Sequence, residues 1–259
     1  MGRGVNALES VLRHPRTLVA GVLLLIVLPA WAWIVLMARD MYGSMRGPAA
    51  WMMTVHWDVA HLVLLWAMWS VMMAAMMVPS AAPVVLLYIR AIRNRLGEHD
   101  GAPGLYAITT GYLTVWTLFS VAATIAQRVL ASRLMLTPMM EPATPRISGV
   151  VLVLAGVYQL TPLKRACLRA CRSPLSVVMT HSRTTPFRLG VAHGLYCLGC
   201  CWMLMLLLFA GGVMNLFVIA ALTAWVAVEK LAPLGEQGAR VSGALLVVAG
   251  GWLLYAAAA

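Results

Sequence analysis

The sequence predicts an all-α membrane protein, a polytopic bundle of about seven transmembrane helices. The chain has 259 residues, of which 62% are hydrophobic and 10% charged, and its mean hydropathy is +0.87. A soluble domain of this length cannot hide so much apolar surface in one core. The apolar residues also gather in stretches of about 17 to 23 residues, the length that crosses a bilayer as a helix. The lipid bilayer is therefore the first partner that we expect.

Seven apolar windows account for most of the chain. The fourth and the sixth are close to the minimum length for a span, and Gly211 and Gly212 leave almost no loop between the fifth and the sixth. We expect residues 1–16 to form a cytoplasmic segment and residues 17–257 to form a single transmembrane domain. The windows cover residues 17–38, 59–78 (extending toward 92), 105–127, 147–163, 189–210, 213–229 and 241–257.

The formal net charge of +11 predicts an orientation in the membrane. When the 19 Lys and Arg residues are placed between the windows, 14 fall on the side of the N-terminus. Basic residues concentrate on the cytoplasmic side of membrane proteins, so we expect the N-terminus inside and the C-terminus outside. The charge is thus explained without a nucleic-acid partner, and we expect none. The five basic residues on the other side are Arg39, Arg46, Arg128, Arg133 and Arg146.

The first window has an alternative interpretation as a secretory signal peptide. Arg13 and Arg16 precede it, and the residues 30–32, Ala-Trp-Ala, resemble a cleavage site. However, the apolar run continues to Ala38. At about 22 residues it is too long for a signal core and long enough to span, so we expect a transmembrane helix.

The second window carries methionines at helical spacing. Pro79 and Pro83 should bend this long helix near its inner end. A methionine stripe can be packing alone, but Asp58 and His61 at the outer mouth favour a role in collecting a metal ion. The residues that follow the spacing of three and four are Asp58, His61, Leu65, Met68, Met72 and Met76, with Met73 and Met77 alongside.

The fifth window concentrates soft metal ligands. Thiolate and thioether donors suit Cu(I) best among the common metal ions, and the oxygen donors that Mg²⁺ and Ca²⁺ need are nearly absent. Packing alone accounts for any single Cys or Met, whereas the whole group favours a Cu(I) site. On a helix most of its members share one broad face: His193, Cys197, Cys201 and Met205 are four apart, with Cys200 beside Cys197.

The second and fifth helices can be matched in depth if they are antiparallel neighbours. We take about 1.5 Å per residue across a hydrocarbon core of about 30 Å. The small residues Gly190 and Gly194 would allow a close helix contact. We therefore expect one site that combines thiols of the fifth helix with thioethers of the second. The predicted level pairs are Met68 with Cys200, Met72 with His193 to Cys197, and His61 with Met205.

The inner side of the predicted bundle carries two further features. Cys167 and Cys171 lie four apart on an expected short cationic helix, where neighbouring Arg and Lys side chains lower thiol pKa values. A structural disulfide is not expected in the cytoplasm, and two incidental thiols on a basic helix are the alternative. The pair Glu229-Lys230 indicates an ion pair near the inner surface, or a carboxylate that relays a metal ion.

Several of these segments resemble one known family. They are residues 72–83, residues 158–164 with Cys167 and residues 171–174, residues 194–202, residues 212–215, and the pair Glu229-Lys230. Together they resemble a bacterial family described as predicted metal-binding integral membrane proteins, a domain of unknown function. The likeness covers roughly residues 50–255. It implies a multi-pass protein of the bacterial inner membrane that binds a metal, and it does not extend to His193.

The function that these patterns favour is a binding or transport protein for Cu(I) rather than an enzyme. Asp58 and His61 would collect the ion, the soft cluster would hold it, and Cys167 with Cys171 would exchange it inside. The expected recipient is a membrane or periplasmic metalloprotein that is being assembled.

Two alternatives belong to other classes. The first is a membrane thiol oxidoreductase that exchanges electrons with quinone and uses Cys197 and Cys200 as its redox pair. The expected depth of this pair, near the midplane, would keep it from a water-soluble thiol partner. The second is a non-catalytic subunit of a larger membrane complex, with His61 or His193 as a haem ligand.

Overall fold

The computed structural model describes residues 15–43, 58–96, 101–180, 184–232 and 235–258. In this part of the chain the regular structure is helical, apart from one isolated bridge between Leu136 and Pro142. The all-α prediction is confirmed. The helices are α2 (Pro15–Met41), α4 (Val59–Leu96), α5 (Gly101–Ser132), α6 (Pro145–Leu160), α7 (Pro162–Arg172), α8 (Pro174–Thr180), α9 (Pro186–Gly211), α10 (Leu216–Leu231) and α11 (Gly235–Ala256).

Each predicted window overlaps one of these helices, and the fourth also reaches into α7, but the windows are not equal as membrane spans. Five helices of the described chain are long and apolar enough to cross a membrane: α2, α4, α5, α9 and α11. A sixth candidate is the pair α6 and α7, which meet at an angle of 66°. The helix α10, with 16 residues, is shorter than a full span. The number seven therefore remains a prediction.

The break between α6 and α7 has a local cause at Thr161. Its backbone is extended, and its hydroxyl accepts a hydrogen bond from the backbone N–H of Lys164, which caps the new helix. Pro162 at the first position of α7 lacks an N–H and cannot continue the helix before it. The predicted fourth span, residues 147–163, is consequently interrupted at this corner, and its last two residues belong to α7. The short cationic helix expected around Cys167 is confirmed as α7.

The turn between α9 and α10 is as tight as predicted. Gly212 has φ +92°, a backbone conformation that side chains disfavour. Asn215 then caps the start of α10, because its side chain accepts hydrogen bonds from the backbone N–H groups of Phe217 and Val218. The chain thus reverses direction within a few residues.

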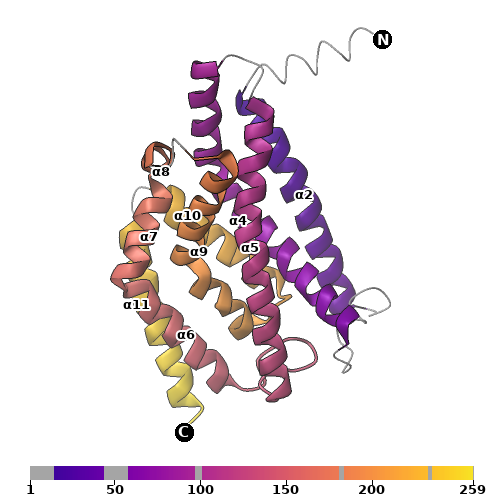
Figure 1. Cartoon of the computed structure of the whole chain (residues 1–259). Coiled ribbons are helices and arrows are strands. Elements are labelled where there is room, and N and C mark those ends of the chain that lie inside the picture. The colour runs from indigo at the N-terminus through magenta and orange to yellow at the C-terminus, as the bar shows by residue number, and fades with distance from the viewer. Residues whose placement is uncertain (1–14, 44–57, 97–100, 181–183, 233–234, 259) are drawn as a thin grey trace.

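Glycines allow two helix pairs to pack closely. A Cβ on Gly190 of α9 would lie 2.1 Å from the carbonyl oxygen of Ile108 in α5, and one on Gly156 of α6 would lie 2.6 Å from that of Gly243 in α11. Figure 1 shows α6 and α11 side by side in the lower part of the molecule. Close approach through small residues is the usual way in which helices associate in lipid. The close contact expected at Gly190 and Gly194 of the fifth window is therefore present, but the neighbouring helix is α5 and not α4.

Large apolar side chains cover much of the outer surface of the bundle. Leu25 is 76% exposed, Phe217 81% and Trp252 68%. Such exposure would be costly in water and suits contact with lipid chains. The start of α2 and the end of α11 lie at opposite ends of the bundle (Figure 1). This arrangement agrees with termini on opposite sides of a membrane.

Candidate metal centre

The buried face of α9 presents the soft side chains that the sequence singles out. His193, Cys197, Cys200, Cys201 and Met205 are all nearly inaccessible. All five cysteines of the chain are thiols, with no disulfide among them. The thiols of Cys200 and Cys201 donate to the carbonyl oxygen of Cys197 at 3.1 and 2.8 Å. These three cysteines thus occupy one turn of a buried helix.

Cys197 is the centre of this group. Its sulfur lies 2.9 Å from the Nζ atom of Lys230 in α10 and 3.0 Å from the hydroxyl of Tyr112 in α5. Lys230 also donates to the hydroxyl of Ser80 in α4 at 3.0 Å. Side chains from α5 and α10 therefore contact this thiol of α9 directly, and Ser80 of α4 binds the ammonium beside it.

The helix α7 adds two more thiols. Cys171 is buried, and its side chain interacts with those of Cys197 and Cys200. Cys167 is half-buried and lies against α9, where a Cβ on Gly199 would meet its sulfur at 2.7 Å. The outer side of α7 is basic, and its exposed Arg169 lies 3.9 Å from Glu236. Cys171 of the cationic helix α7 thus meets Cys197 and Cys200 of α9, although at least 26 residues separate them in the sequence.

The thioether that reaches the thiols is Met77. Its sulfur lies 3.8 Å from that of Cys201 and 3.9 Å from Nζ of Lys230. The expectation that Met68 and Met72 would be level with the thiols was wrong. Relative to α9, the residues of α4 are displaced along the helix axis by about three turns from the positions that the depth match assumed, so Met77 is the methionine level with Cys201. That match counted from residue 59 over the length of one span, whereas α4 has 38 residues and continues through Pro79 and Pro83.

The other methionines of the stripe have their own places. Trp69 packs on Phe209 of α9, with ring centroids 5.2 Å apart, so this part of α4 is level with the far end of α9. Met68, Met72 and Met76 are buried in the core. Met205, one turn beyond Cys201, is buried there as well. None of these four side chains forms a hydrogen bond with a thiol in the described part of the chain.

Asp58 and His61 lie far from the thiols. The Asp58 carboxylate accepts a hydrogen bond from the backbone N–H of His61 at 2.8 Å and so caps the start of α4. From His61 to Met77 is sixteen residues, or about 24 Å along a helix. These two residues can belong to an entry region, but they do not belong to the thiol cluster.

His193 is buried one turn before Cys197. It stacks on Tyr112 with ring centroids 5.6 Å apart. Neither ring nitrogen has a hydrogen-bond partner within the described residues. Buried polar atoms are normally paired. One ring nitrogen of this imidazole can therefore still donate a hydrogen bond, and the other can still accept one, beside the cluster.

The Glu229 carboxylate serves a different centre from its neighbour Lys230. It forms a buried ion pair with Lys164 of α7 at 2.6 Å. Gln159 of α6 and Trp225 of α10 donate to its other oxygen at 2.6 and 2.8 Å. Adjacent residues on a helix point in different directions, which explains why Glu229 and Lys230 do not pair. The neighbouring ion pair is therefore observed, with Lys164 as the partner.

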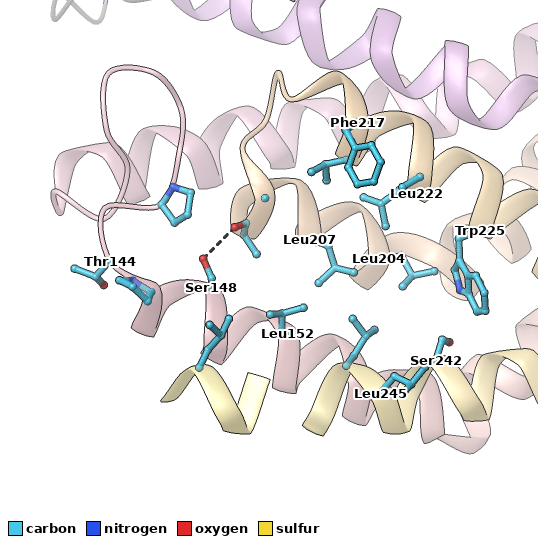
Figure 2. Close-up of a pocket in the computed structure, with 18 of the residues that line it drawn as sticks. Thr144, Ser148, Leu152, Leu204, Leu207, Phe217, Leu222, Trp225, Ser242 and Leu245 are labelled. Atoms are coloured by element: carbon cyan, nitrogen blue, oxygen red, sulfur yellow. Dashed lines mark hydrogen bonds between the residues drawn. The ribbon is translucent and has the colours of Figure 1, made fainter. Parts of the chain in front are cut away.

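A separate apolar cavity of about 780 Å³ lies between α6, α9, α10 and α11. Figure 2 shows Leu204, Leu207 and Leu245 pointing into it, and the hydroxyl of Ser148 bonded to the carbonyl of Ala210 at 3.0 Å. None of the five thiols lines this cavity. It is distinct from the candidate metal centre.

A comparison with protein families decides the class. The model of a family named PpoB2 and described as copper chaperone matches residues 66–253, which is more than half of the chain. The chain belongs to this copper chaperone family. No curated protein and no solved structure matches it. Family membership agrees with the metal-binding membrane family that the motifs resemble, and with copper as the metal.

The donor set of this copper chaperone fits its cargo. Four buried thiols and one thioether are soft ligands, and copper in its lower oxidation state prefers such ligands. In the described residues no three His, Cys, Asp or Glu side chains are already arranged to hold a metal ion. The thiols of Cys200 and Cys201 instead point to a backbone carbonyl. A metal ion held by these two thiols would require both side chains to turn away from that carbonyl.

Three groups around Cys197 were not expected from the sequence as parts of the site. Met77 was noted only as a neighbour of the methionine stripe, and Lys230 only as a partner for Glu229. Nothing in the sequence indicated that Tyr112 belongs to the site, because a single Tyr in an apolar helix is common. One clue was available for Lys230, since a lysine is rarely placed near a membrane core without a specific partner.

Proposed function

We propose that this copper chaperone is an integral membrane protein that binds Cu(I) in the thiol cluster beneath α7 and transfers it to a metalloprotein under assembly. Cys197 supplies one thiolate, one of Cys171, Cys200 and Cys201 supplies the second, and Met77 supplies a thioether. The observation that carries the proposal is the meeting of α4, α7 and α9 at one buried soft-ligand cluster.

The arrangement of α7 supports an exchange route on its side of the bundle. Cys167 is half-buried over Gly199, whereas Cys171 is buried against Cys197 and Cys200. A Cu(I) ion can pass between thiolates by ligand exchange, so Cys167 is placed to be the first or last thiol on the path. Asp58, His61 and the buried methionines Met68, Met72, Met76 and Met205 remain candidates for the path on the other side. His193 is a candidate supporting ligand.

The proposal includes an orientation. The protein crosses the bacterial inner membrane seven times, with α6 and α10 as short crossings, the N-terminus inside and the C-terminus outside. The basic surface of α7 then faces the cytoplasm, in agreement with the distribution of the basic residues. The thiol cluster lies on that side, where the cell keeps thiols reduced.

Metal analysis of the protein purified in detergent under anaerobic conditions tests the proposal. The wild type should retain Cu(I), and the variant with Cys197, Cys200 and Cys201 all changed to Ser should lose it. Cys167→Ser is the matched control, because this thiol is outside the buried cluster. We expect it to keep the equilibrium binding and to slow the exchange with a soluble chelator. A triple Ser variant that holds copper like the wild type would refute the proposal.

Thiol labelling separates this function from the thiol oxidoreductase alternative. Cu(I) should protect the thiols of the α9 cluster from maleimide, and quinone should have little effect. Conversion of Cys197 and Cys200 to a disulfide by quinone would favour the oxidoreductase instead.

A further inference from the structure

Both lysines of the chain are buried, and among the described residues a carboxylate partner is present for only one of them. Lys164 is paired with Glu229 at 2.6 Å. Lys230 is 6% exposed, and its ammonium contacts the sulfur of Cys197, the hydroxyl of Ser80 and the sulfur of Met77. Within the described structure no Asp or Glu lies at ion-pair distance from Lys230.

The charge of Lys230 has a direct consequence for the metal that can bind beside it. Two thiolates and one Cu(I) ion form a complex with a net charge of −1, after the thiol protons have left to the medium. A net charge in a buried, apolar environment is costly unless an opposite charge lies close to it. With Lys230 included, the complex of a monovalent ion is neutral. The same complex of a divalent ion carries +1.

We propose that Lys230 is the specificity-determining residue of the metal centre, a fixed counter-charge that selects monovalent over divalent soft ions. This inference rests on the proposed function, because it takes Cys197 as a ligand. The ammonium donates to the sulfur of Cys197 at 2.9 Å and leaves that sulfur further lone pairs for a metal ion. The ammonium also donates to the hydroxyl of Ser80 at 3.0 Å, and this second hydrogen bond helps to hold the charge in position.

The geometry also has an opposite reading, in which the ammonium occupies the place of the metal ion and must be displaced. The two interpretations predict opposite changes in the affinity for a monovalent ion when Lys230 is replaced. If Lys230 balances the charge, its removal weakens the binding of a monovalent ion. If Lys230 competes with the metal, its removal strengthens that binding.

The test uses Ag(I) and Cd(II), two thiophilic ions that differ in charge. Their affinities are measured by competition with a soluble thiol chelator on the full-length protein in detergent. For Lys230→Leu we expect the affinity for Ag(I) to fall by at least about tenfold and that for Cd(II) to stay or rise. Lys230→Arg keeps the charge and should keep the preference for Ag(I). Arg240→Leu removes an exposed positive charge and should leave both affinities unchanged.

Each outcome decides the proposal. An equal fall for both ions, or a gain for Ag(I), in Lys230→Leu would overturn it. If the Leu variant does not fold, Lys230→Gln replaces it, and the preference of Lys230→Arg for Ag(I) is decisive if both neutral variants fail. Failure of the proposed function looks different: the wild type would bind neither ion through its cysteines, as shown by unchanged binding in the triple Ser variant.

Discussion

At the scale of single residues, the structure separates Met77 from the other methionines of α4. Its sulfur is 3.8 Å from Cys201, whereas Met68 and Met72 lie in the apolar core. We expect Met77→Leu to weaken Cu(I) binding by about tenfold, because one of few ligands is lost. Replacement of Met by Leu conserves volume and should cost less than about 1.5 kcal/mol of stability. Competition with a coloured Cu(I) chelator measures the affinity.

Met68→Leu with Met72→Leu is the matched control for this prediction. The double variant removes two buried thioethers from the same helix and should bind Cu(I) like the wild type. The reverse result, with copper lost in the double variant and kept in Met77→Leu, would move the site toward the outer half of α4.

A second prediction at this scale concerns the buried ion pair. Glu229→Gln leaves the ammonium of Lys164 buried without a counter-charge, which should destabilise the protein by about 3 to 5 kcal/mol. Combining Lys164→Met with Glu229→Gln removes both charges and should recover part of this loss. Thermal unfolding in detergent measures the difference. Equal stability of Glu229→Gln and the wild type would show that this pair does not hold α7 to α10.

At the scale of elements, the contact between α5 and α9 sets the position of Cys197 against Tyr112. A Cβ on Gly190 would lie 2.1 Å from the carbonyl oxygen of Ile108, a backbone atom that can move only if the helices separate. We expect Gly190→Ala to lower the unfolding temperature and to weaken Cu(I) binding. Gly251→Ala in α11 is the control, since nothing lies within 4 Å of the added carbon. Equal behaviour of the two variants would contradict the close α5–α9 contact.

At the scale of the whole molecule, the prediction is the topology. A reporter fused after Ala259 should be active outside, and one inserted next to Thr184, after α8, should report inside. The reason is the concentration of 14 of the 19 basic residues on one side. An inward C-terminus would mean an even number of crossings, and the short helix α10 would be the first to be reconsidered. Such a result would also require the side of the membrane on which the thiol cluster lies to be assigned again.

The sequence by itself determined the class of this protein and the kind of chemistry it offers. Long apolar windows are typical of membrane-spanning helices, and five of them recur as helices long and apolar enough to cross a membrane: α2, α4, α5, α9 and α11. Cysteines four apart share a helix face wherever the helix lies, so the cluster around Cys197 was readable. The softness of its ligands indicated copper, in agreement with the family to which the chain belongs.

Only the tertiary structure decided which side chains meet. Periodicity gives the face of a helix, but α4 is buried on several sides, so its methionine stripe did not identify the residue that touches Cys201. The relative depth of two residues depends on where long helices begin and end. An error of about three turns in that depth led to the prediction that Met68 would be level with the thiols, whereas the structure places Met77 there. Lys230 lies beside Cys197 because α10 packs into the bundle after a tight turn at Gly212. Such long-range contacts arise from packing, and local sequence patterns do not contain them.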